Sequence, residues 1–262
     1  MHGLDTYDYG ARQYDPARIT WDRMDQLCEK YYHINPYVYC AGNPINAIDP
    51  DGCDTVNISY TDGKWIFNDP IVAKGDDVFN VTIDGKTSTY TFSEGEWGER
   101  VVALNLESNN DYTIGVYHVS GAEKDGTGYY VTPGGEPSTK VGSNARIPEG
   151  CYPILSPNGG KWRQPQVGGN VAGRGIRFHY GGQNPRQWTE GCFVLSSDYS
   201  ISNGNVIFNM QESKNAVQNF DYKLGGGDFY PYTFTNSKGK RVKRYGSRFL
   251  NPIKHKLYLK KK

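Results

Sequence analysis

The sequence contains no long apolar run, and no stretch approaches the roughly 20 residues that a membrane-spanning helix needs. It also lacks the charged and then apolar opening that marks a secretory signal peptide. We therefore expect synthesis in the cytoplasm and no membrane span. Any action outside the producing cell would then require a specialised secretion system.

Cysteine is also scarce. An odd number of cysteines, five, occurs at irregular spacing with no CxxC pair, which argues against a disulfide framework and against a cysteine-rich metal site. We expect reduced thiols, one of them free for chemistry, and no metal or organic cofactor. The five are Cys28, Cys40, Cys53, Cys151 and Cys192.

Helical patterns are sparse, whereas glycine (32) and tyrosine (21) are abundant and only 37% of the residues are hydrophobic. This composition predicts a mainly β fold of short strands and turns. The net charge of +1 indicates no particular partner. No acidic residue follows Asp228, so the C-terminal segment is basic. We interpret it as a solvated extension and expect no nucleic-acid partner, although such tails can bind nucleic acid.

The first fifty residues alternate tyrosine with turn formers, in "YDYGARQYDP" (7–16) and "YYHINPYVYCAGNPINAIDPDG" (31–52). Such a pattern predicts short aromatic strands joined by turns. It resembles the end of the Rhs (YD-repeat) core. The resemblance implies that residues 1–52 are the C-terminal fragment of a β-shell, followed by a variable domain that is often a toxin. Family cores self-cleave with aspartates, but we expect Asp49 and Asp51 to be structural, because most of the shell is missing.

Residues 53–110 predict a small antiparallel β region without chemistry. Its alternating runs are interrupted by Asp62-Gly63 and Asp84-Gly85, which are strong hairpin signals. Strand patterns continue from Asp111, and residues 209–220 form a partial helical stripe. We expect domains at 1–52, 53–110 and 111–225, and a basic extension at 226–262.

The segment "FHYGGQNPRQWTEGCFVLS" (178–196) carries the candidate chemistry. A thiol with a pKa of about 8.5 needs a neighbouring base to act as a nucleophile near neutral pH. His179 ends an apolar strand pattern, and Cys192 follows Gly191, which allows a tight turn that brings N–H groups to the nucleophile. These residues predict a cysteine-dependent active site.

The order "H-x-x-G … T-x-G-C-apolar", with "RIPEGCYPI" (146–154) upstream, resembles the L,D-transpeptidase motif. The resemblance implies a β-sandwich or barrel with few short helices over residues 111–225. Cys192 would be the nucleophile and His179 its base, oriented by the backbone carbonyl of Tyr180. The N–H groups of Gly191 and Cys192 would meet the oxyanion, and the Thr189 hydroxyl would hold the turn.

Five residues are candidates for substrate binding. Arg174 and Arg177 are suited to peptide carboxylates, and the other three flank the motif: Gly182, Thr189 and Glu190. Glu190 and Val194 depart from the usual pattern, which leaves transfer, exchange and hydrolysis open. Cys151 and His118 are expected to be structural.

The resemblances together imply a peptidoglycan-directed cysteine acyltransferase or peptidase that acts on stem peptides. It would be the effector of an Rhs-type polymorphic toxin used in bacterial competition, secreted into the periplasm of a target cell and countered by an immunity protein. The alternative is a catalytically inactive module of the same fold that binds cell wall or another partner.

Overall fold

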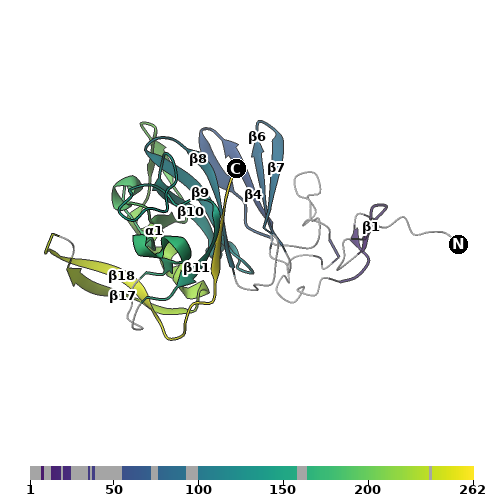
Figure 1. Cartoon of the computed structure of the whole chain (residues 1–262). Coiled ribbons are helices and arrows are strands. Elements are labelled where there is room, and N and C mark those ends of the chain that lie inside the picture. The colour runs from purple at the N-terminus through teal and green to yellow at the C-terminus, as the bar shows by residue number, and fades with distance from the viewer. Residues whose placement is uncertain are drawn as a thin grey trace. The chain divides into compact units, whose positions relative to one another are not determined.

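The computed structural model describes residues 7–8, 13–18, 20–24, 35, 37–38, 55–71, 76–92, 100–157, 164–235 and 238–262. The chain divides into two compact units (Figure 1). Unit 1 comprises Met1–Tyr60 and Trp65–Glu94, and unit 2 comprises Thr61–Lys64 and Gly95–Lys262. None of the described helices is long and apolar enough to cross a membrane.

Unit 1 begins with a three-stranded antiparallel sheet of β1 (Tyr7–Asp8), β2 (Gln13–Asp15) and β3 (Thr20–Trp21). Trp21 is buried, and its ring meets that of Tyr14 edge to face at 6.0 Å. The expected short aromatic strands are therefore present in this part of the chain. Asp49 and Asp51 lie outside the described residues.

The second sheet has the order β5-β4-β6-β7. Its strands are β4 (Thr55–Thr61), β5 (Lys64–Phe67), β6 (Asp77–Ile83) and β7 (Lys86–Phe92). Both Asp-Gly pairs form the predicted turns, with left-handed φ values of 51° and 74° at Asp62 and Gly63 and of 49° and 73° at Asp84 and Gly85. The expectation of a purely antiparallel sheet was wrong, because β4 and β6 pair in parallel.

An eight-stranded mixed sheet organises unit 2, in the order β12-β11-β19-β8-β9-β10-β14-β13. Only β19–β8 and β13–β14 are parallel neighbours. The strands are β8 (Arg100–Ser108), β9 (Tyr112–Val119), β10 (Thr127–Pro133), β11 (Gly150–Leu155), β12 (Gln166–Val167), β13 (Phe178–Tyr180), β14 (Phe193–Ser196) and β19 (Lys256–Lys261).

The two edges of this sheet approach each other. Gln166 on β12 forms a bridge with Arg177, next to β13, and the Val167 N–H donates to the Ile176 carbonyl at 2.8 Å. The sheet is thus a nearly closed barrel, and the prediction of a mainly β fold is confirmed. The described connections also contain the 3-10 helices η3 (Lys124–Gly126), η5 (Gly169–Arg174) and η6 (Pro185–Trp188). A small hairpin of β15 (Ser200–Ser202) and β16 (Asn205–Ile207) follows β14.

The predicted helix is α1 (Met210–Lys223). Asn209 caps its N-terminus by accepting hydrogen bonds from the Gln211 and Glu212 N–H groups at 2.8 and 3.2 Å. Near the C-terminal end of the helix, Phe220 is fully buried, and the centroid of its ring lies 4.7 Å from that of Phe178. The helix therefore covers the strands that carry the candidate site.

The predicted domain boundaries at 110 and 225 were wrong. Strand β8 belongs to unit 2, and β19 inserts between β11 and β8 in the middle of the sheet. Leu257 and Leu259 alternate inward from β19 and are buried in the core. Residues 226–262 are thus an integral part of this unit rather than an extension.

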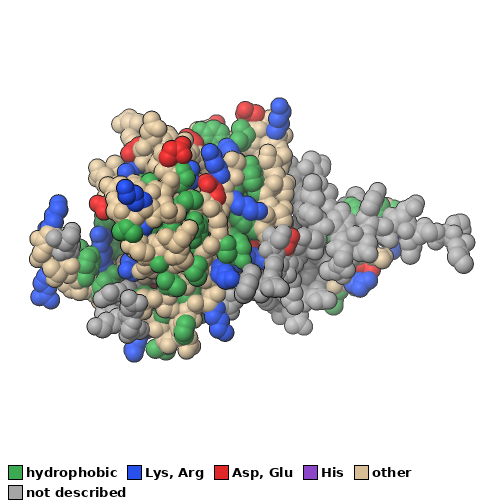
Figure 2. Space-filling view, in the orientation of Figure 1, with side chains coloured by type: hydrophobic (Ala, Val, Ile, Leu, Met, Phe, Trp, Pro, Cys, Tyr) green, Lys and Arg blue, Asp and Glu red, His purple; other side chains and the backbone are tan. Residues whose placement is uncertain are grey.

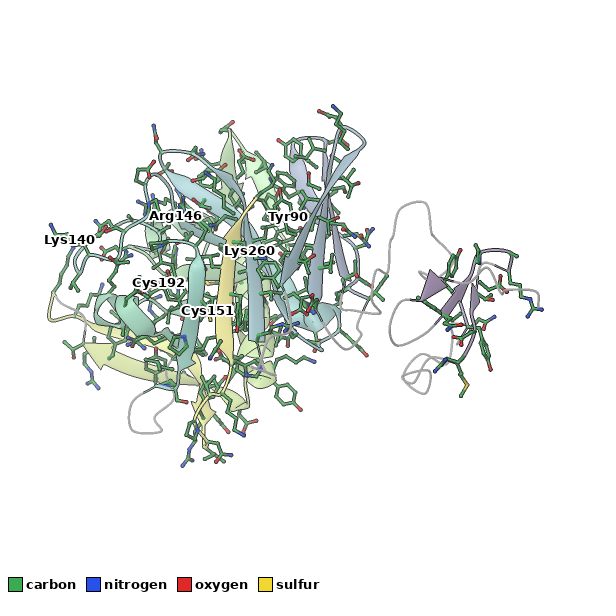
Figure 3. All side chains as sticks on the ribbon, turned by 45° about the vertical axis from the view of Figure 1, so that its right-hand side comes forward. Tyr90, Lys140, Arg146, Cys151, Cys192 and Lys260 are labelled. Carbon is green, nitrogen blue, oxygen red and sulfur yellow. The ribbon has the colours of Figure 1, made fainter. Side chains whose placement is uncertain are left out.

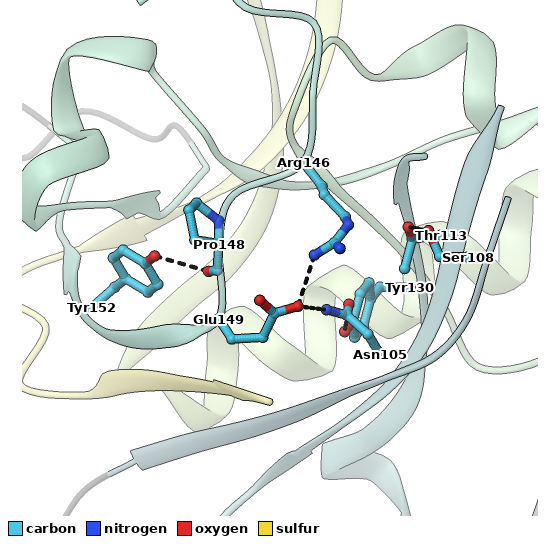
Figure 4. Close-up of polar contacts among 8 residues, drawn as sticks. All are labelled: Asn105, Ser108, Thr113, Tyr130, Arg146, Pro148, Glu149 and Tyr152. Carbon is cyan, nitrogen blue, oxygen red and sulfur yellow. Dashed lines mark hydrogen bonds and ion pairs between the residues drawn. The ribbon is translucent and has the colours of Figure 1, made fainter. Parts of the chain in front are cut away.

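A polar network fastens the segment that leads into β11 (Figure 4). The buried Arg146 guanidinium donates to Glu149 Oε1 at 2.8 Å, and Asn105 Nδ2 donates to the same oxygen at 3.4 Å. Asn105 Oδ1 in turn accepts from the Tyr130 hydroxyl at 2.7 Å. The "RIPEGCYPI" segment is therefore anchored to the central strands β8 and β10 by charge-assisted contacts.

Asp221 on α1 is fully buried, and neither carboxylate oxygen has a hydrogen-bond partner of normal geometry among the described residues. Burial raises the pKa of Asp221 to about 8. The folded state then holds this proton more tightly than the unfolded state, so stability falls as the pH rises from about 4 to about 8. We expect Asp221→Asn to raise the unfolding free energy by about 1–3 kcal/mol at pH 8.5 and to give little gain at pH 4. Urea titrations at both pH values test this, and an equal effect at both would contradict it.

Candidate active site

Cys192 and His179 come from neighbouring parallel strands. Phe178 and Phe193 lie opposite each other in the register of β13 and β14 and point into the core. His179 follows the first phenylalanine and Cys192 precedes the second, so alternation turns both side chains to the opposite face. Both line one cavity of about 740 Å³. The fold thus brings together the two residues predicted as nucleophile and base.

The His179 ring is oriented by its own strand. Its Nδ1 lies 2.9 Å from the backbone carbonyl of Tyr180, the contact predicted from the motif. A neutral imidazole that donates from Nδ1 keeps the Nε2 lone pair as an acceptor. Burial lowers the pKa of His179 to about 4, opposed by this carbonyl and reinforced by the charges of Arg244 and Arg177. The ring is therefore neutral at pH 7 and suited to accept a proton.

The Cys192 thiol is partly buried, and burial raises its pKa. The backbone N–H of Arg177, which lies 3.4 Å from Sγ, opposes this shift, as do the charges of Arg177 and Arg174. With a raised thiol pKa and a lowered imidazole pKa, the resting cavity holds a neutral thiol and a neutral imidazole. Proton transfer would accompany nucleophilic attack rather than precede it.

The turn before the thiol is held by Thr189, as predicted. Its hydroxyl donates to the Cys192 carbonyl at 2.7 Å and accepts from the Gly191 N–H at 3.0 Å. Thr189 is only 3% exposed. This hydroxyl therefore supports the loop, and its expected contact with substrate does not fit the structure.

Gly191 has a left-handed φ of +141°, and a Cβ there would lie 2.6 Å from Ile176 Cδ1. Glycine is thus required at this position. Because its N–H is bonded to Thr189, its predicted role as an oxyanion donor is wrong for this conformation. Within the described part of the chain the Cys192 N–H forms no hydrogen bond, so it is the better donor for an oxyanion.

Arg174 was expected to bind substrate, but it organises a loop instead. Its Nη1 donates to the Ser138 carbonyl, and its Nη2 donates to the Ser143 and Ala145 carbonyls at 2.9 and 2.5 Å. A Cβ on Gly191 would approach this guanidinium to 2.7 Å. Arg174 therefore joins the 138–145 segment to the thiol turn, and both of its terminal guanidinium nitrogens donate to backbone carbonyls.

We expect Arg174→Met to lower the unfolding free energy by about 2–4 kcal/mol, because three partly buried backbone carbonyls lose a charged donor. Arg241→Met, an exposed site on the same unit, is the matched control and is expected to change stability by about 0.5 kcal/mol or less. Urea denaturation of both variants makes the comparison. Equal stability of the two variants would contradict this role.

Gly182, Glu190 and Cys151 do not have the places that were expected from the sequence. Gly182 is buried, where an added Cβ would meet Met210 and Trp188 at 3.1 and 3.4 Å, so it is a packing residue rather than a substrate contact. Glu190 is exposed and does not line the cavity. Cys151, expected in the core, is exposed on β11, where Figure 3 labels it. It faces outward because β11 alternates, with Tyr152 and Ile154 turned inward.

The residues that sequence reasoning missed come from the hairpin of β17 (Gly226–Thr235) and β18 (Arg241–Phe249), which supplies a wall of the cavity. Tyr232 and Arg244 are opposite one another in this hairpin. Alternation in "FYPYTF" was the available signal for aromatic side chains on one face, but nothing local indicated their target. The cavity is lined by Gln164, Gly175, Arg177, His179, Tyr180, Trp188, Cys192, Tyr232, Thr233, Phe234, Thr235 and Arg244.

Gln164 connects this hairpin to the strand of the base. Its Oε1 accepts from the Tyr232 hydroxyl at 2.6 Å, and its Nε2 donates to the Tyr245 carbonyl at 3.1 Å. Its backbone carbonyl accepts from Arg177 Nη1 at 3.2 Å. The hairpin wall is therefore fixed in place by hydrogen bonds at the cavity.

No three acidic, histidine or cysteine side chains gather as a metal site within the described ranges. No protein-family model, curated protein or solved structure matches the chain. A thiol and a neutral imidazole that line one cavity are the groups that nucleophilic catalysis by cysteine requires.

Proposed function

We propose that unit 2 is a cysteine acyltransferase or peptidase with an L,D-transpeptidase-like fold, acting on peptidoglycan stem peptides. The observation that carries the proposal is the shared cavity of Cys192 and His179, with His179 oriented by the Tyr180 carbonyl at 2.9 Å. This arrangement supplies a nucleophile, a base and a group that orients the base.

In the proposed reaction the Cys192 sulfur attacks the carbonyl carbon of a stem-peptide amide while His179 Nε2 takes the thiol proton. The carbonyl oxygen becomes an oxyanion, which the Cys192 N–H stabilises. The intermediate collapses as the C–N bond breaks, and His179 returns the proton to the leaving amine. A thioester on Cys192 remains.

Deacylation follows the same path in reverse. Water or an amine attacks the thioester carbonyl and passes a proton to His179, and the C–S bond breaks as the sulfur recovers that proton. Water gives hydrolysis, a free amino acid gives exchange, and the amine of a second stem gives transfer. None of these steps uses a metal or an organic cofactor.

The Rhs-like opening of the chain supports a biological setting for this chemistry. A polymorphic toxin effector would be made in the cytoplasm, exported by a specialised system and delivered to the periplasm of a competing bacterium. A cognate immunity protein would protect the producer.

Incubation of the purified chain with sacculi and with tetrapeptide stems, followed by separation of the muropeptides, tests the proposal. We expect shortened stems, exchanged terminal residues or new cross-links. An unchanged muropeptide profile with both substrates would contradict the proposed function.

A further inference from the structure

The active-site cavity carries an uncompensated positive charge. Arg177 and Arg244 are among its lining residues, and no aspartate or glutamate of the described ranges is. Neither arginine forms an ion pair anywhere in the described chain. Two guanidinium groups left without a counter-ion in a partly enclosed site attract an anionic ligand.

Arg244 is held in place by an aromatic ring. Its guanidinium carbon lies 4.9 Å from the centroid of the Trp188 ring. It comes from β18, opposite Tyr232, whose hydroxyl is itself fixed on Gln164. The Tyr180 side chain also hydrogen-bonds Arg244. Since a guanidinium has five N–H donors, others remain for a planar anion such as a carboxylate.

Arg177 also lines this cavity and immediately precedes β13, the strand that carries His179. Among the residues that the structure describes, the Arg177 guanidinium uses only Nη1, in the 3.2 Å hydrogen bond to the Gln164 carbonyl, which leaves its other donors for a ligand. Both arginines line the cavity together with His179, and their charges oppose protonation of its ring. Figure 2 shows further Lys and Arg side chains at the hairpin. The exposed Lys240, Arg241 and Lys243 do not line the cavity.

We infer that Arg244 and Arg177 form a carboxylate-binding subsite next to Cys192 and His179, with Arg244 as a determinant of specificity. This inference rests on the proposed function, because it assigns the ligand of the same cavity. The substrate class is then a peptide that carries a free carboxylate close to the amide that is attacked. A bidentate contact with the Arg244 fork would fix the direction in which the peptide enters.

The test compares two probes: the tetrapeptide N-acetyl-L-alanyl-D-isoglutaminyl-L-lysyl-D-alanine, which has a single free carboxylate, and its C-terminal amide. Binding is measured by calorimetry to the full chain with Cys192→Ala, so that no turnover occurs. We expect the acid to bind about tenfold more tightly than the amide, and we expect Arg244→Gln to reduce this preference to about twofold or less.

Arg244→Lys is expected to retain part of the preference, since it keeps the charge without the fork. Arg241→Gln removes the same charge from an exposed position on the hairpin and is expected to retain all of it. Thermal melts of Arg244→Gln and Arg241→Gln check that the hairpin stays folded. Equal binding of acid and amide, no binding of either, or a preference that survives Arg244→Gln in a folded variant would overturn the subsite.

Failure of the subsite and failure of the proposed function are distinguishable. Turnover of both peptides by the wild-type chain at equal rates would sustain the acyltransferase and overturn the subsite. A carboxylate preference in binding, without any turnover by the wild-type chain, would sustain the subsite and contradict the enzyme.

Discussion

Cys192→Ala is expected to lower the turnover of stem peptides by about 10⁴-fold or more, because the attacking atom is removed and no other group forms the thioester. Substrate affinity is expected to change little, since the thiol contributes only one small part of a cavity of about 740 Å³. The measurement is the initial rate of release of the leaving amine, together with a separate binding titration.

Cys151→Ala is the matched control for this loss. Cys151 is a free, exposed thiol on β11 and does not line the cavity. Its substitution is expected to leave the rate at the wild-type level. A Cys192→Ala variant that keeps more than about a tenth of the wild-type rate would exclude Cys192 as the nucleophile.

His179→Gln is expected to lower kcat by about 10²–10⁴-fold with a small change in KM, because the thiol loses its base while the cavity keeps its shape. The wild-type rate should also fall as the pH drops through about 4, the value to which burial lowers the pKa of His179. The imidazole acts as a base only when it is deprotonated, so activity is present above this pKa and is lost below it.

The pH profile of the variant separates this role from a structural one. His179→Gln should lose the acidic limb near pH 4, whereas a variant that is merely misfolded would keep the limb at reduced amplitude. Wild-type activity that declines already near pH 6.5 would show that the imidazole titrates at its ordinary value and would contradict the buried, neutral ring.

The local part of this site was predictable from the sequence. Alternation in "IRFHY" and "GCFVL" places Phe178 and Phe193 in the core and turns His179 and Cys192 to the other face. The turn residues Thr189 and Gly191 follow from the same short motif. These features depend on interactions between near neighbours, which the sequence displays directly.

The rest depends on distant pairings that carry little local signal. The parallel pairing of β19 with β8 joins residues about 150 positions apart. The local sequence "KLYLKK" does not indicate with which strand it pairs. The cavity wall containing Tyr232 and Arg244 likewise depends on distant contacts, since Gln164, 68 positions before Tyr232, holds the hairpin in place. Arg174 was misassigned for a related reason, since its carbonyl partners come from a loop about 30 residues earlier.

The alternative, an inactive binding module, draws on two features of the site. Burial raises the pKa of the Cys192 thiol, and the Gly191 N–H is bonded to Thr189 instead of being open to an oxyanion. A binding module would engage stem peptides without changing them. The two hypotheses therefore differ in whether a covalent intermediate forms.

Intact-protein mass spectrometry after rapid acid quenching of the chain with a tetrapeptide stem tests the central claim most directly. Acid preserves a thioester, and peptide mapping locates it. The account predicts an added acyl mass on Cys192 that is absent from Cys192→Ala and forms far more slowly in His179→Gln. Turnover without an adduct at Cys192, or an adduct on another residue, would contradict it.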